Sequence, residues 1–364
     1  MRVLVATDSY GGFCSAPDAT AAIAEGLLGA GLGAHTHPMS DGGEGFLDAL
    51  HAHRHMDFHG LPISGPIGRP TFATAGRLDE TWVVESATAM GLHLCGKERM
   101  PGRATSAGLG TFLAHLASKA EGPFILGLGG SASVDGGLGM LQALGLHAID
   151  EQGRTLEPRG GATRLTHVRR LVGPPPLHDR ILQVLCDVQI PLREAAALFG
   201  PQKGVHREDI EPLTEAHARW ADTLNRWRQD HGRDSIDPER PGGGAAGGLA
   251  FAAAAVLGGH LVAGAPLFAR VSNLDQAIHQ ADAVVTGEGR MDPTTFSGKV
   301  ASVVIDRARR DDTLVVALVG QAEDVPPPPA GPDHLILADS DPDPEAAFGP
   351  AIQALATLLK NQRA

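Results

Sequence analysis

Residues 124–144 read FILGLGGSASVDGGLGMLQAL, in which an apolar run, a glycine-rich turn and a second apolar-rich stretch follow one another. The run at 124–126 predicts a short strand, and the spacing over 138–144 predicts a helix. In open α/β sheets, ligands bind beyond the carboxyl ends of the strands. We therefore expect functional residues in the turn between the two elements.

The same alternation continues in both directions along the chain. Apolar runs at 3–6, 181–186, 283–285 and 313–319 predict strands, and residues 17–28, 110–119, 208–230 and 299–310 predict helices. A glycine-rich turn that starts at residue 40 runs into a helix that extends to residue 50. Turn residues around 71–75 and 81–84 predict antiparallel strands between the two ends. This order predicts an α/β protein with one discontinuous domain.

Composition excludes several classes of protein. The chain has 364 residues, of which 47 are glycine and 26 proline, and its formal net charge is −12. Glycine at about 13% exceeds the usual 7%, but it shows no three-residue period, so collagen is excluded. An acidic chain is unsuited to a general electrostatic grip on nucleic acid. With few aromatic residues, the core is expected to consist mainly of Ala, Leu and Val.

The cysteines and the long apolar segments indicate the cellular compartment of the protein. Cys14, Cys95 and Cys186 are odd in number and far apart, so we expect no disulfide framework or zinc finger and infer a reducing cytoplasm. The first apolar run is too short for a signal peptide. Residues 245–269 carry His260 and Pro266 and lack the density of large apolar residues of a membrane span, so they predict a buried helix. Neither a membrane nor a nucleic acid is expected as a partner.

A cluster of histidines invites a metal-site interpretation. His51 and His55 have the i,i+4 spacing of metal ligands on a helix, and His53 and His59 lie close by in sequence. No carboxylate or cysteine motif completes a site. We interpret the cluster as a solvated helix end and loop.

Glycines and carboxylates recur together at the ends of predicted strands. The segments are 8–12, 40–45, 127–137, 185–187 with 199–204, and 285–292, and a sixth glycine run spans 241–248. Each alone is also compatible with an ordinary turn. Together they favour Mg²⁺–phosphate chemistry, in which carboxylates hold the metal and bare amides bind phosphate oxygens.

Two nucleotide-binding motifs give different results. The P-loop pattern is absent, because Ser297-Gly298-Lys299 is followed by Val300 and lacks the upstream glycine. Residues 127–132 fit the dinucleotide fingerprint, and Asp150 follows at roughly the expected distance of about twenty residues. An NAD-dependent dehydrogenase of a small hydroxy acid is therefore an alternative. A Tyr-x-x-x-Lys proton relay is absent, however, because Cys14 stands four residues after Tyr10, the sole tyrosine.

Six short motifs occur in a telling order: DGGEG at 41–45, GGSASVDGG at 129–137, CDV at 186–188, FGPQKG at 199–204, GAAGG at 244–248 and TGEGRMD at 286–292. In this combination the chain resembles the bacterial glycerate kinase family, which phosphorylates D-glycerate, typically at the 2-hydroxyl, with ATP and Mg²⁺. The resemblance runs from Val3 to about Gly320. It implies two α/β domains with the active site in the cleft between them. The expected domains are a Rossmann-like parallel-sheet domain over 1–60 and 270–364, and an inserted mixed-sheet domain over 61–269.

The chain departs from the family pattern at three positions. Gly11 stands where the family has lysine, and Val134 and Ile190 stand where it has asparagine. The missing lysine removes one contact to substrate carboxylate or phosphate, for which Lys203 or Arg290 could substitute. A non-catalytic metabolite-binding relative therefore remains a third interpretation, and a homodimer is left open.

The resemblance implies specific roles in phosphoryl transfer. Asp187 is the predicted group that orients and deprotonates the substrate hydroxyl, and Lys203 and Arg290 neutralise phosphate or clamp the carboxylate. The predicted metal ligands are Glu288, Asp292 and Asp135, with Asp41 as an alternative. The predicted substrate contacts are Asp8, Ser9, Asp41, Ser131 and Ser133, and the predicted ATP or phosphate contacts are Gly129, Gly130, Gly243, Gly244, Gly247 and Gly287.

Overall fold

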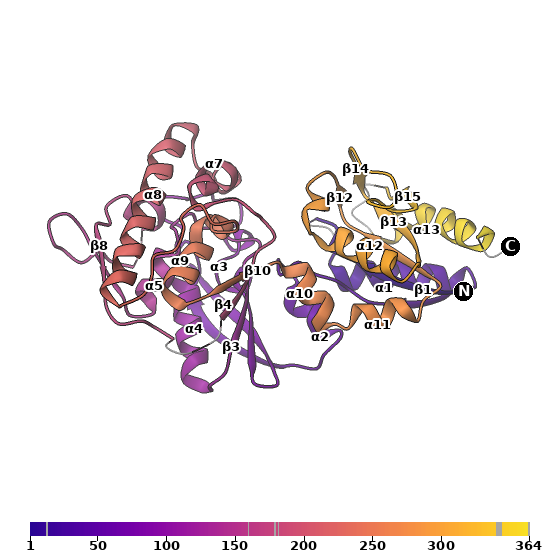
Figure 1. Ribbon diagram of the computed structural model, residues 1–364, viewed down its shortest axis with the longest axis horizontal. Coiled ribbons are helices and arrows are strands. Elements are labelled where there is room, and N and C mark those ends of the chain that lie inside the picture. The colour runs from indigo at the N-terminus through magenta and orange to yellow at the C-terminus, as the bar shows by residue number, and fades with distance from the viewer. Residues whose placement is uncertain (12–13, 159, 178–179, 181, 340–343, 363–364) are drawn as a thin grey trace. The chain divides into compact units, whose positions relative to one another are not determined.

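The computed structural model describes residues 1–11, 14–158, 160–177, 180, 182–339 and 344–362 (Figure 1). Gly12, in a predicted motif, and Ile181, at the start of a predicted strand, lie outside the described residues. Tertiary contacts divide the chain into two compact units. Unit 1 contains Met1–Asp41, Gly45–His55 and Ala263–Ala364, and unit 2 contains Gly42–Glu44 and Met56–Val262. The boundaries expected from the sequence lie at 60/61 and 269/270.

Unit 1 is built on a parallel sheet with the strand order β15-β13-β11-β1-β2. Its strands are β1 (Arg2–Thr7), β2 (Gly33–Thr36), β11 (Ala283–Gly287), β13 (Leu314–Val319) and β15 (His334–Leu337). The central strand β11 is buried at every position. Such continuous burial is typical of parallel strands that are covered on both faces.

The helices of unit 1 are α1 (Ala16–Gly29), α2 (Phe46–His51), α10 (Gly264–Val271), α11 (Leu274–His279), α12 (Val300–Arg310) and α13 (Pro344–Asn361). Helix α1 begins where Ser15 accepts a hydrogen bond from the amide of Asp18, next to a proline in the first turn. It packs against α13 and β1. The apolar core beneath it includes Val3, Ile23 and Phe348.

Unit 2 contains a six-stranded mixed sheet with the order β10-β9-β6-β5-β4-β3. Its strands are β3 (Asp57–Ser64), β4 (Pro70–Leu78), β5 (Thr81–Glu85), β6 (Phe124–Gly127), β9 (Leu182–Leu185) and β10 (His260–Val262). Strands β3, β4 and β5 pair antiparallel, and β5, β6, β9 and β10 pair parallel. The parallel sheet of unit 1 and the mixed sheet of unit 2 confirm the expected α/β fold class.

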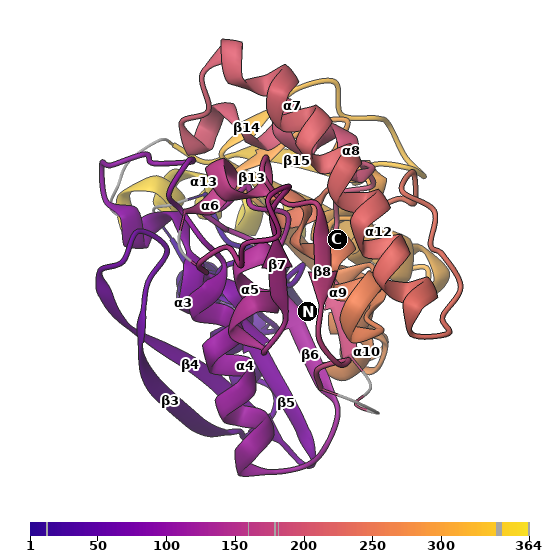
Figure 2. The ribbon, with the colours of Figure 1, turned by 90° about the vertical axis from the view of Figure 1, so that its left-hand side faces the viewer.

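The helices of unit 2 are α3 (Ser86–Met90), α4 (Ala107–Lys119), α5 (Leu138–Ala143), α6 (Gly161–Leu165), α7 (Ala195–Phe199), α8 (Arg207–Asp230) and α9 (Leu249–Leu257). Figure 2 shows α4 and α5 side by side, and these two helices make extensive contact. All three tryptophans, Trp82, Trp220 and Trp227, are 1% exposed in the core of this unit. The three tryptophans are thus concentrated in one core.

The single buried helix expected over 245–269 is wrong in its length. The segment forms a 3₁₀ turn, η4 (Ala245–Gly248), then α9, β10 and α10. Gly258 ends α9 in the left-handed conformation with φ 72°, a position that glycine adopts without strain. The buried character was nevertheless predicted, because every residue of α9 is buried.

The histidine cluster was also misinterpreted in part. His59 lies on strand β3, where its ring packs against Trp82 with a centroid distance of 4.9 Å. The ring of His53 lies 4.1 Å from that of His37, and its Nε2 is 2.8 Å from the carbonyl of Pro38. His53 lies in the turn after α2, as expected, but is half-buried, whereas His59 is exposed but lies on a strand and not in a loop.

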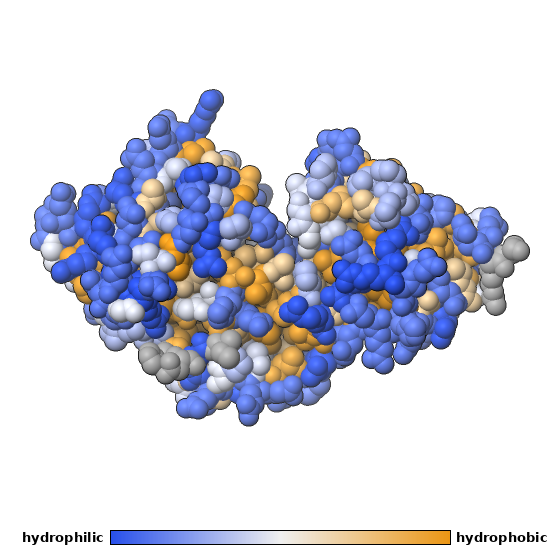
Figure 3. Space-filling view, viewed as in Figure 1, coloured by the Kyte–Doolittle hydropathy of each residue, from blue (hydrophilic) through white to orange (hydrophobic). Residues whose placement is uncertain are grey.

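Figure 3 shows a largely hydrophilic surface with scattered apolar patches on the displayed face. Among the described residues, the exposed large apolar side chains are Leu28, Phe58, Phe72, Leu198, Leu335 and Leu337. Within the described part of the chain, we find no helix with the length and apolar character needed to cross a membrane.

Candidate active site

One candidate site lies at the carboxyl edge of the unit 1 sheet. Thr7, the last residue of β1, is in register with Gly287, the last residue of β11. Asp8 and Glu288 therefore leave the sheet side by side, and the amide of Asp8 donates to the carbonyl of Gly287 at 2.9 Å. The amide of Ser9 donates to Oδ1 of Asp8 at 2.7 Å. The predicted residues Asp8, Ser9, Gly287 and Glu288 are thus brought together.

Gly287 is required at this edge because of close packing. A Cβ at this position would lie 2.0 Å from the carbonyl oxygen of Leu318 and 2.2 Å from the hydroxyl of Tyr10. That hydroxyl donates to the same carbonyl at 2.6 Å. Gly287 thus lets β1, β11 and β13 approach one another, and its predicted contact with phosphate remains a prediction.

Carboxylates in unit 1 raise one another's pKa. Burial raises the pKa of Asp8 well above its ordinary value, and Asp41 and Glu288 add to the rise, while Lys299 opposes it. Burial also raises the pKa of Glu288 to about 7, against the opposing effects of a hydrogen bond from Thr295 and the charge of Lys299. Mutual repulsion of this kind is relieved by a cation, so the group is suited to binding one.

Glu288 has the environment that fits a Mg²⁺ ion. Its Oε1 is buried and has no hydrogen-bond partner in the structure. Within the described ranges, no three His, Cys, Asp or Glu side chains are grouped so that they could hold a metal ion by themselves. Mg²⁺ is commonly held by one or two carboxylates together with substrate phosphates and water. Glu288 thus fits a site that the substrate completes.

Arg290 and Asp292 lie close together beyond β11, Arg290 in the two-residue strand β12 (Arg290–Met291) and Asp292 directly after it. The guanidinium of Arg290 pairs with Glu323, and its Nε lies 3.6 Å from Oδ2 of Asp292. Oδ1 of Asp292 accepts hydrogen bonds from the amide and hydroxyl of Thr294, at 2.8 and 2.6 Å. The hydroxyl bond of Thr294 is the largest of the effects that hold the pKa of Asp292 below its ordinary value. Both predicted site residues therefore already have partners of their own.

A second candidate site lies at the carboxyl edge of the parallel strands in unit 2. Glu85 of β5 is in register with Gly127 of β6, which is in register with Leu185 of β9. The segments after these strands therefore leave the sheet together. They contain the glycine-rich loop and, two residues beyond β9, the half-buried Asp187.

Residues Gly42–Glu44 of the DGGEG motif belong to unit 2 and lie against this edge. A Cβ on Gly129 would lie 2.3 Å from Cα of Gly43, and a Cβ on Gly42 would lie 2.7 Å from Cβ of Leu185. Glycine is needed at Gly129 because the two backbones approach so closely, and at Gly42 because its φ is 91° and the side chain of Leu185 lies against it. Gly130 adopts φ 70°, and its carbonyl accepts a hydrogen bond from Leu92 at 2.7 Å.

Asp135 organises the glycine-rich loop through hydrogen bonds. Its Oδ2 accepts from the amide and hydroxyl of Ser106 at 2.8 and 2.9 Å, and from the amide of Gly139 at 3.3 Å. Its Oδ1 accepts from the amide of Gly137 at 3.1 Å. The side chain is 1% exposed. Its oxygens are therefore occupied by donors, and its assignment as a metal ligand stays a prediction.

Lys203 is a buried cation of unit 2. It ends the 3₁₀ turn Pro201–Lys203 and is 3% exposed. Its Nζ donates to the hydroxyl of Ser131 and to the carbonyl of Ser133, both at 2.8 Å. Burial lowers its pKa to about 7, although the carboxylate of Asp135 opposes the shift. The structure thus joins three predicted residues: Lys203, Ser131 and Ser133.

Helix α8 holds the same loop from another side. Trp220 donates from its indole nitrogen to the carbonyl of Gly136 at 2.8 Å, and Nε2 of His217 lies 3.2 Å from the carbonyl of Val134. Burial lowers the pKa of His217 to about 4. The ring is therefore neutral near pH 7, and its Nε2–H donates to Val134. These two bonds fix the backbone of the loop.

The glycines after residue 241 serve packing and internal hydrogen bonds. The amides of Gly243 and Gly244 donate to the carbonyls of Arg240 and Ile190, at 3.3 and 3.0 Å. Gly247 adopts φ 67°, and a Cβ there would lie 2.4 Å from the carbonyl of Ser133. The amides of Gly243 and Gly244 therefore already have acceptors within the chain. The phosphate contact of this segment stays a prediction.

The residue that supports the dehydrogenase alternative also has a local role. Oδ1 of Asp150 accepts from the amides of Gln152 and Arg154, both at 2.9 Å. Its Oδ2 accepts from Nε of Arg154 at 2.9 Å. Asp150 thus closes its own turn, whereas a dinucleotide site needs this carboxylate for the ribose.

Three further residues were missed by the sequence reasoning. Glu85 ends β5 at the unit 2 edge and Ser86 comes directly after it; they are 6% and 0% exposed. They could have been found by extending the strand-end rule to the strand predicted at 81–84. Lys299 lowers the pKa of the unit 1 carboxylates Asp8, Glu288 and Asp292, and the incomplete P-loop pattern around it predicts no such role.

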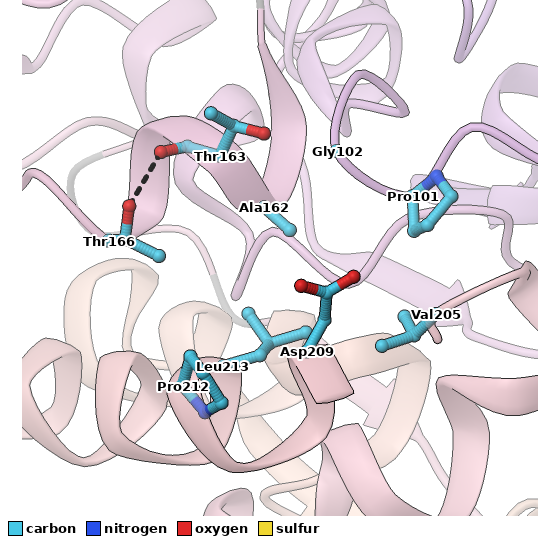
Figure 4. A pocket seen from close by; sticks show the side chains of 9 residues that line it. All are labelled: Pro101, Gly102, Ala162, Thr163, Thr166, Val205, Asp209, Pro212 and Leu213. Atoms are coloured by element: carbon cyan, nitrogen blue, oxygen red, sulfur yellow. Dashed lines mark hydrogen bonds between the residues drawn. The ribbon is translucent and has the colours of Figure 1, made fainter. Parts of the chain in front are cut away.

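A separate pocket in unit 2 contains none of the predicted site residues. Its volume is about 170 Å³, and its lining includes Pro101, Thr163, Thr166, Val205 and Asp209 (Figure 4). The hydroxyl of Thr166 donates to the carbonyl of Thr163 at 2.8 Å. The Asp209 carboxylate comes from the first turn of α8, where it complements the helix dipole.

Comparison with known proteins identifies the family. The sequence profile of the glycerate kinase family matches residues 3–335. Glycerate kinase of Bacillus subtilis (strain 168) is 33% identical over 329 residues, which cover 88% of this chain and 85% of that protein. Glycerate 2-kinase of Escherichia coli (strain K12) is 33% identical over 333 residues, which cover 89% of this chain and 86% of that protein.

A solved structure gives the same result in three dimensions. The crystal structure of a Salmonella typhimurium LT2 protein assigned as glycerate kinase 2 superposes with a TM-score of 0.80 at 31% identity. The match covers 100% of this chain and 99% of that one. The chain is therefore an enzyme of the kinase class, and it belongs to the glycerate kinase family.

Proposed function

We propose that this enzyme transfers the γ-phosphoryl group of ATP to the 2-hydroxyl of D-glycerate, giving 2-phosphoglycerate and ADP, with Mg²⁺ and in the cytoplasm. The observation that carries the proposal is the buried Lys203, whose Nζ reaches Ser131 and Ser133 in the glycine-rich loop. Burying an ammonium group costs free energy unless an opposite charge compensates it. A phosphate that is being transferred would supply this compensating negative charge.

Asp187 is the proposed proton acceptor. In an in-line transfer, the 2-hydroxyl oxygen forms a bond to the γ-phosphorus while the bond from phosphorus to the leaving oxygen of ADP breaks. The hydroxyl proton passes to the Asp187 carboxylate. A half-buried carboxylate just beyond the end of a parallel strand is suited to orient a hydroxyl in this way.

The remaining residues bind and orient the substrates. Lys203 would place positive charge beside the loop of Ser131 and Ser133, and Glu288 would hold the metal with Asp8 and Asp41 nearby. Mg²⁺, when bound, supplies charge neutralisation at the phosphates. Asp292 and Arg290 remain predicted contributors through their shared ion pair.

A coupled assay of ADP release with ATP, Mg²⁺ and D-glycerate tests the proposal, and phosphorus NMR of the product separates the 2-phosphate from the 3-phosphate. Turnover that yields 2-phosphoglycerate supports it. Reduction of NAD⁺ by a hydroxy acid without ADP release would instead favour the dehydrogenase. Binding of D-glycerate without turnover would favour a non-catalytic relative.

A further inference from the structure

The small pocket of unit 2 has no part in the proposed reaction, because its described lining contains no residue of either strand edge (Figure 4). One wall is the start of α8, which contributes Asp209 and Leu213. The opposite wall is α6 together with Thr166, the residue directly after that helix. Pro101 and Gly102 form a third side. The pocket therefore lies where three separate segments of the chain meet.

Contacts between these segments hold the pocket open in the folded unit. The amide of Ala162 donates to the carbonyl of Pro101 at 3.3 Å, and the amide of Thr163 donates to the carbonyl of Gly102 at 3.4 Å. Helix α6 also packs against α8. All three sides are thus tied together by the fold itself. A ligand would find the pocket already formed, as is usual for small-molecule sites.

The inner part of the pocket is apolar. Ala162, Val205 and Leu213 line it, belong to the core of unit 2 and are 7%, 7% and 5% exposed. The volume is about 170 Å³, which is well below the roughly 300 Å³ at which sites for drug-sized ligands begin. A ligand must therefore be small, and the part of it that enters must be apolar.

The polar groups of the pocket are hydrogen-bond acceptors. Figure 4 shows the carboxylate of Asp209 directed into the pocket, and Asp209 is the charged residue among the described lining residues. Within the described ranges, no hydrogen bond or ion pair engages this carboxylate. The hydroxyl of Thr166 already donates its proton to the carbonyl of Thr163, so its oxygen can still accept from a ligand.

This combination selects for the charge of the ligand. A primary ammonium group carries three donors and no acceptor, so it matches a carboxylate and a hydroxyl oxygen. Hydrogen bonds between charged partners are also stronger than neutral ones. Phosphates and carboxylates are repelled by Asp209 instead. ATP and D-glycerate, both of which are anions, are therefore not expected in this pocket.

We propose that the pocket is a second binding site of this enzyme and that it takes a small organic cation, a primary ammonium group on a short apolar chain. The ammonium group binds the carboxylate of Asp209 and the hydroxyl oxygen of Thr166. The chain packs against Ala162, Val205 and Leu213. This site goes beyond the proposed function and does not depend on it.

Three compounds of equal chain length test the charge of the ligand: n-butylammonium, 1-butanol and butyrate. Saturation-transfer NMR titrations should give a dissociation constant of about 1 mM for n-butylammonium, and the bound cation should raise the thermal midpoint. Binding of 1-butanol should be at least about tenfold weaker, and butyrate should not bind. Absence of n-butylammonium binding would overturn the proposal, and so would butyrate or 1-butanol binding with equal affinity.

Two neighbouring carboxylates locate the cation. Asp209→Asn should raise the dissociation constant of n-butylammonium about tenfold or more, because a charge-assisted hydrogen bond is lost. Glu208→Gln is the matched control, since it removes the same charge from the same first turn of α8 at a position outside the described lining. Thermal midpoints of both variants without ligand show whether they fold normally. Equal weakening in the two variants would indicate a general attraction to the acidic surface and would contradict the site.

A pocket-filling variant tests the apolar part while the charge stays in place. Thr163→Leu, at an exposed position of α6, should fill the pocket and abolish binding although Asp209 is retained. Wild-type affinity in this variant would show that the cation binds outside the pocket and would overturn the proposal. None of these measurements uses turnover, so their failure would leave the proposed phosphorylation of D-glycerate intact.

Discussion

The two strand edges hold their charges in opposite ways. In unit 1, Asp8 and Glu288 are crowded together, and burial raises the pKa of both. In unit 2, Lys203 is buried among hydroxyl and carbonyl oxygens, and burial lowers its pKa to about 7. One edge is therefore short of positive charge, whereas the other encloses a cation in a rigid loop.

This difference suggests a division of labour between the units. An edge with excess negative charge is suited to a metal ion and the anions that accompany it. A loop with a fixed ammonium is suited to charge that develops on a transferring group, because its donors need no rearrangement. Variants at each edge should therefore fail in different ways.

The largest effect is expected at Asp187. Asp187→Asn keeps the shape of the side chain but removes the proton acceptor, so kcat should fall about 10²- to 10⁴-fold. The thermal midpoint should stay near that of the wild type. Steady-state ADP release measures the first quantity and calorimetry the second, with Asp48→Asn in α2 as a control. Activity near that of the wild type would remove Asp187 from the mechanism.

Lys203 should give the next largest effect. Lys203→Met removes the ammonium from the glycine-rich loop, and we expect a loss of about 10²-fold in kcat/KM. Two buried acceptors, on Ser131 and Ser133, lose their donor, at a cost of about 1–3 kcal/mol, which the removal of a buried charge offsets. Lys119→Met, on an exposed side chain of α4, is the control. Equal activity of the two variants would assign Lys203 a structural role only.

The sequence predicted the strands that form the two edges better than the side-chain contacts at those edges. Continuous apolar runs predicted β1, β6, β11 and β13 because buried parallel strands carry few polar residues. The sequence could not reveal that both hydrogen bonds from Ser106 engage Asp135, since Ser106 lies 29 positions away in the chain. Strand β3 was missed because its exposed positions hide the alternation.

Replacing Glu288 should have a smaller effect, on the stability of the folded protein. Its pKa is raised to about 7 in the folded protein, so the folded state binds the proton more tightly than the unfolded chain does. Stability from this group is present below its unfolded pKa, near 4.5, and is lost as the pH rises through 7. Without Mg²⁺, Glu288→Gln should therefore be more stable than the wild type at pH 8, measured by urea unfolding. Glu25→Gln, at an exposed position, is the control. Equal stabilities of the two variants at pH 8 would refute the raised pKa of Glu288.

The histidine pair of unit 1 should affect acid stability and leave activity at neutral pH almost unchanged. Burial lowers the pKa of His37 to about 3, with His53 adding to the shift. His37 therefore folds in its neutral form, and its contribution is complete above its ordinary pKa of about 6.5 and lost as the pH falls toward 3. His37→Gln should flatten this loss in unfolding measurements between pH 7 and 4. The exposed His35→Gln should keep the slope of the wild type, and identical slopes in all three proteins would contradict the assignment.

The central claim is the proposal that this enzyme phosphorylates D-glycerate at its 2-hydroxyl with ATP and Mg²⁺. Its most direct test is the rate of ADP release by the wild-type enzyme with ATP, Mg²⁺ and D-glycerate, with the product identified by phosphorus NMR. We predict turnover that requires all three components and gives 2-phosphoglycerate. No ADP release above the level of the Asp187→Asn variant would contradict the account.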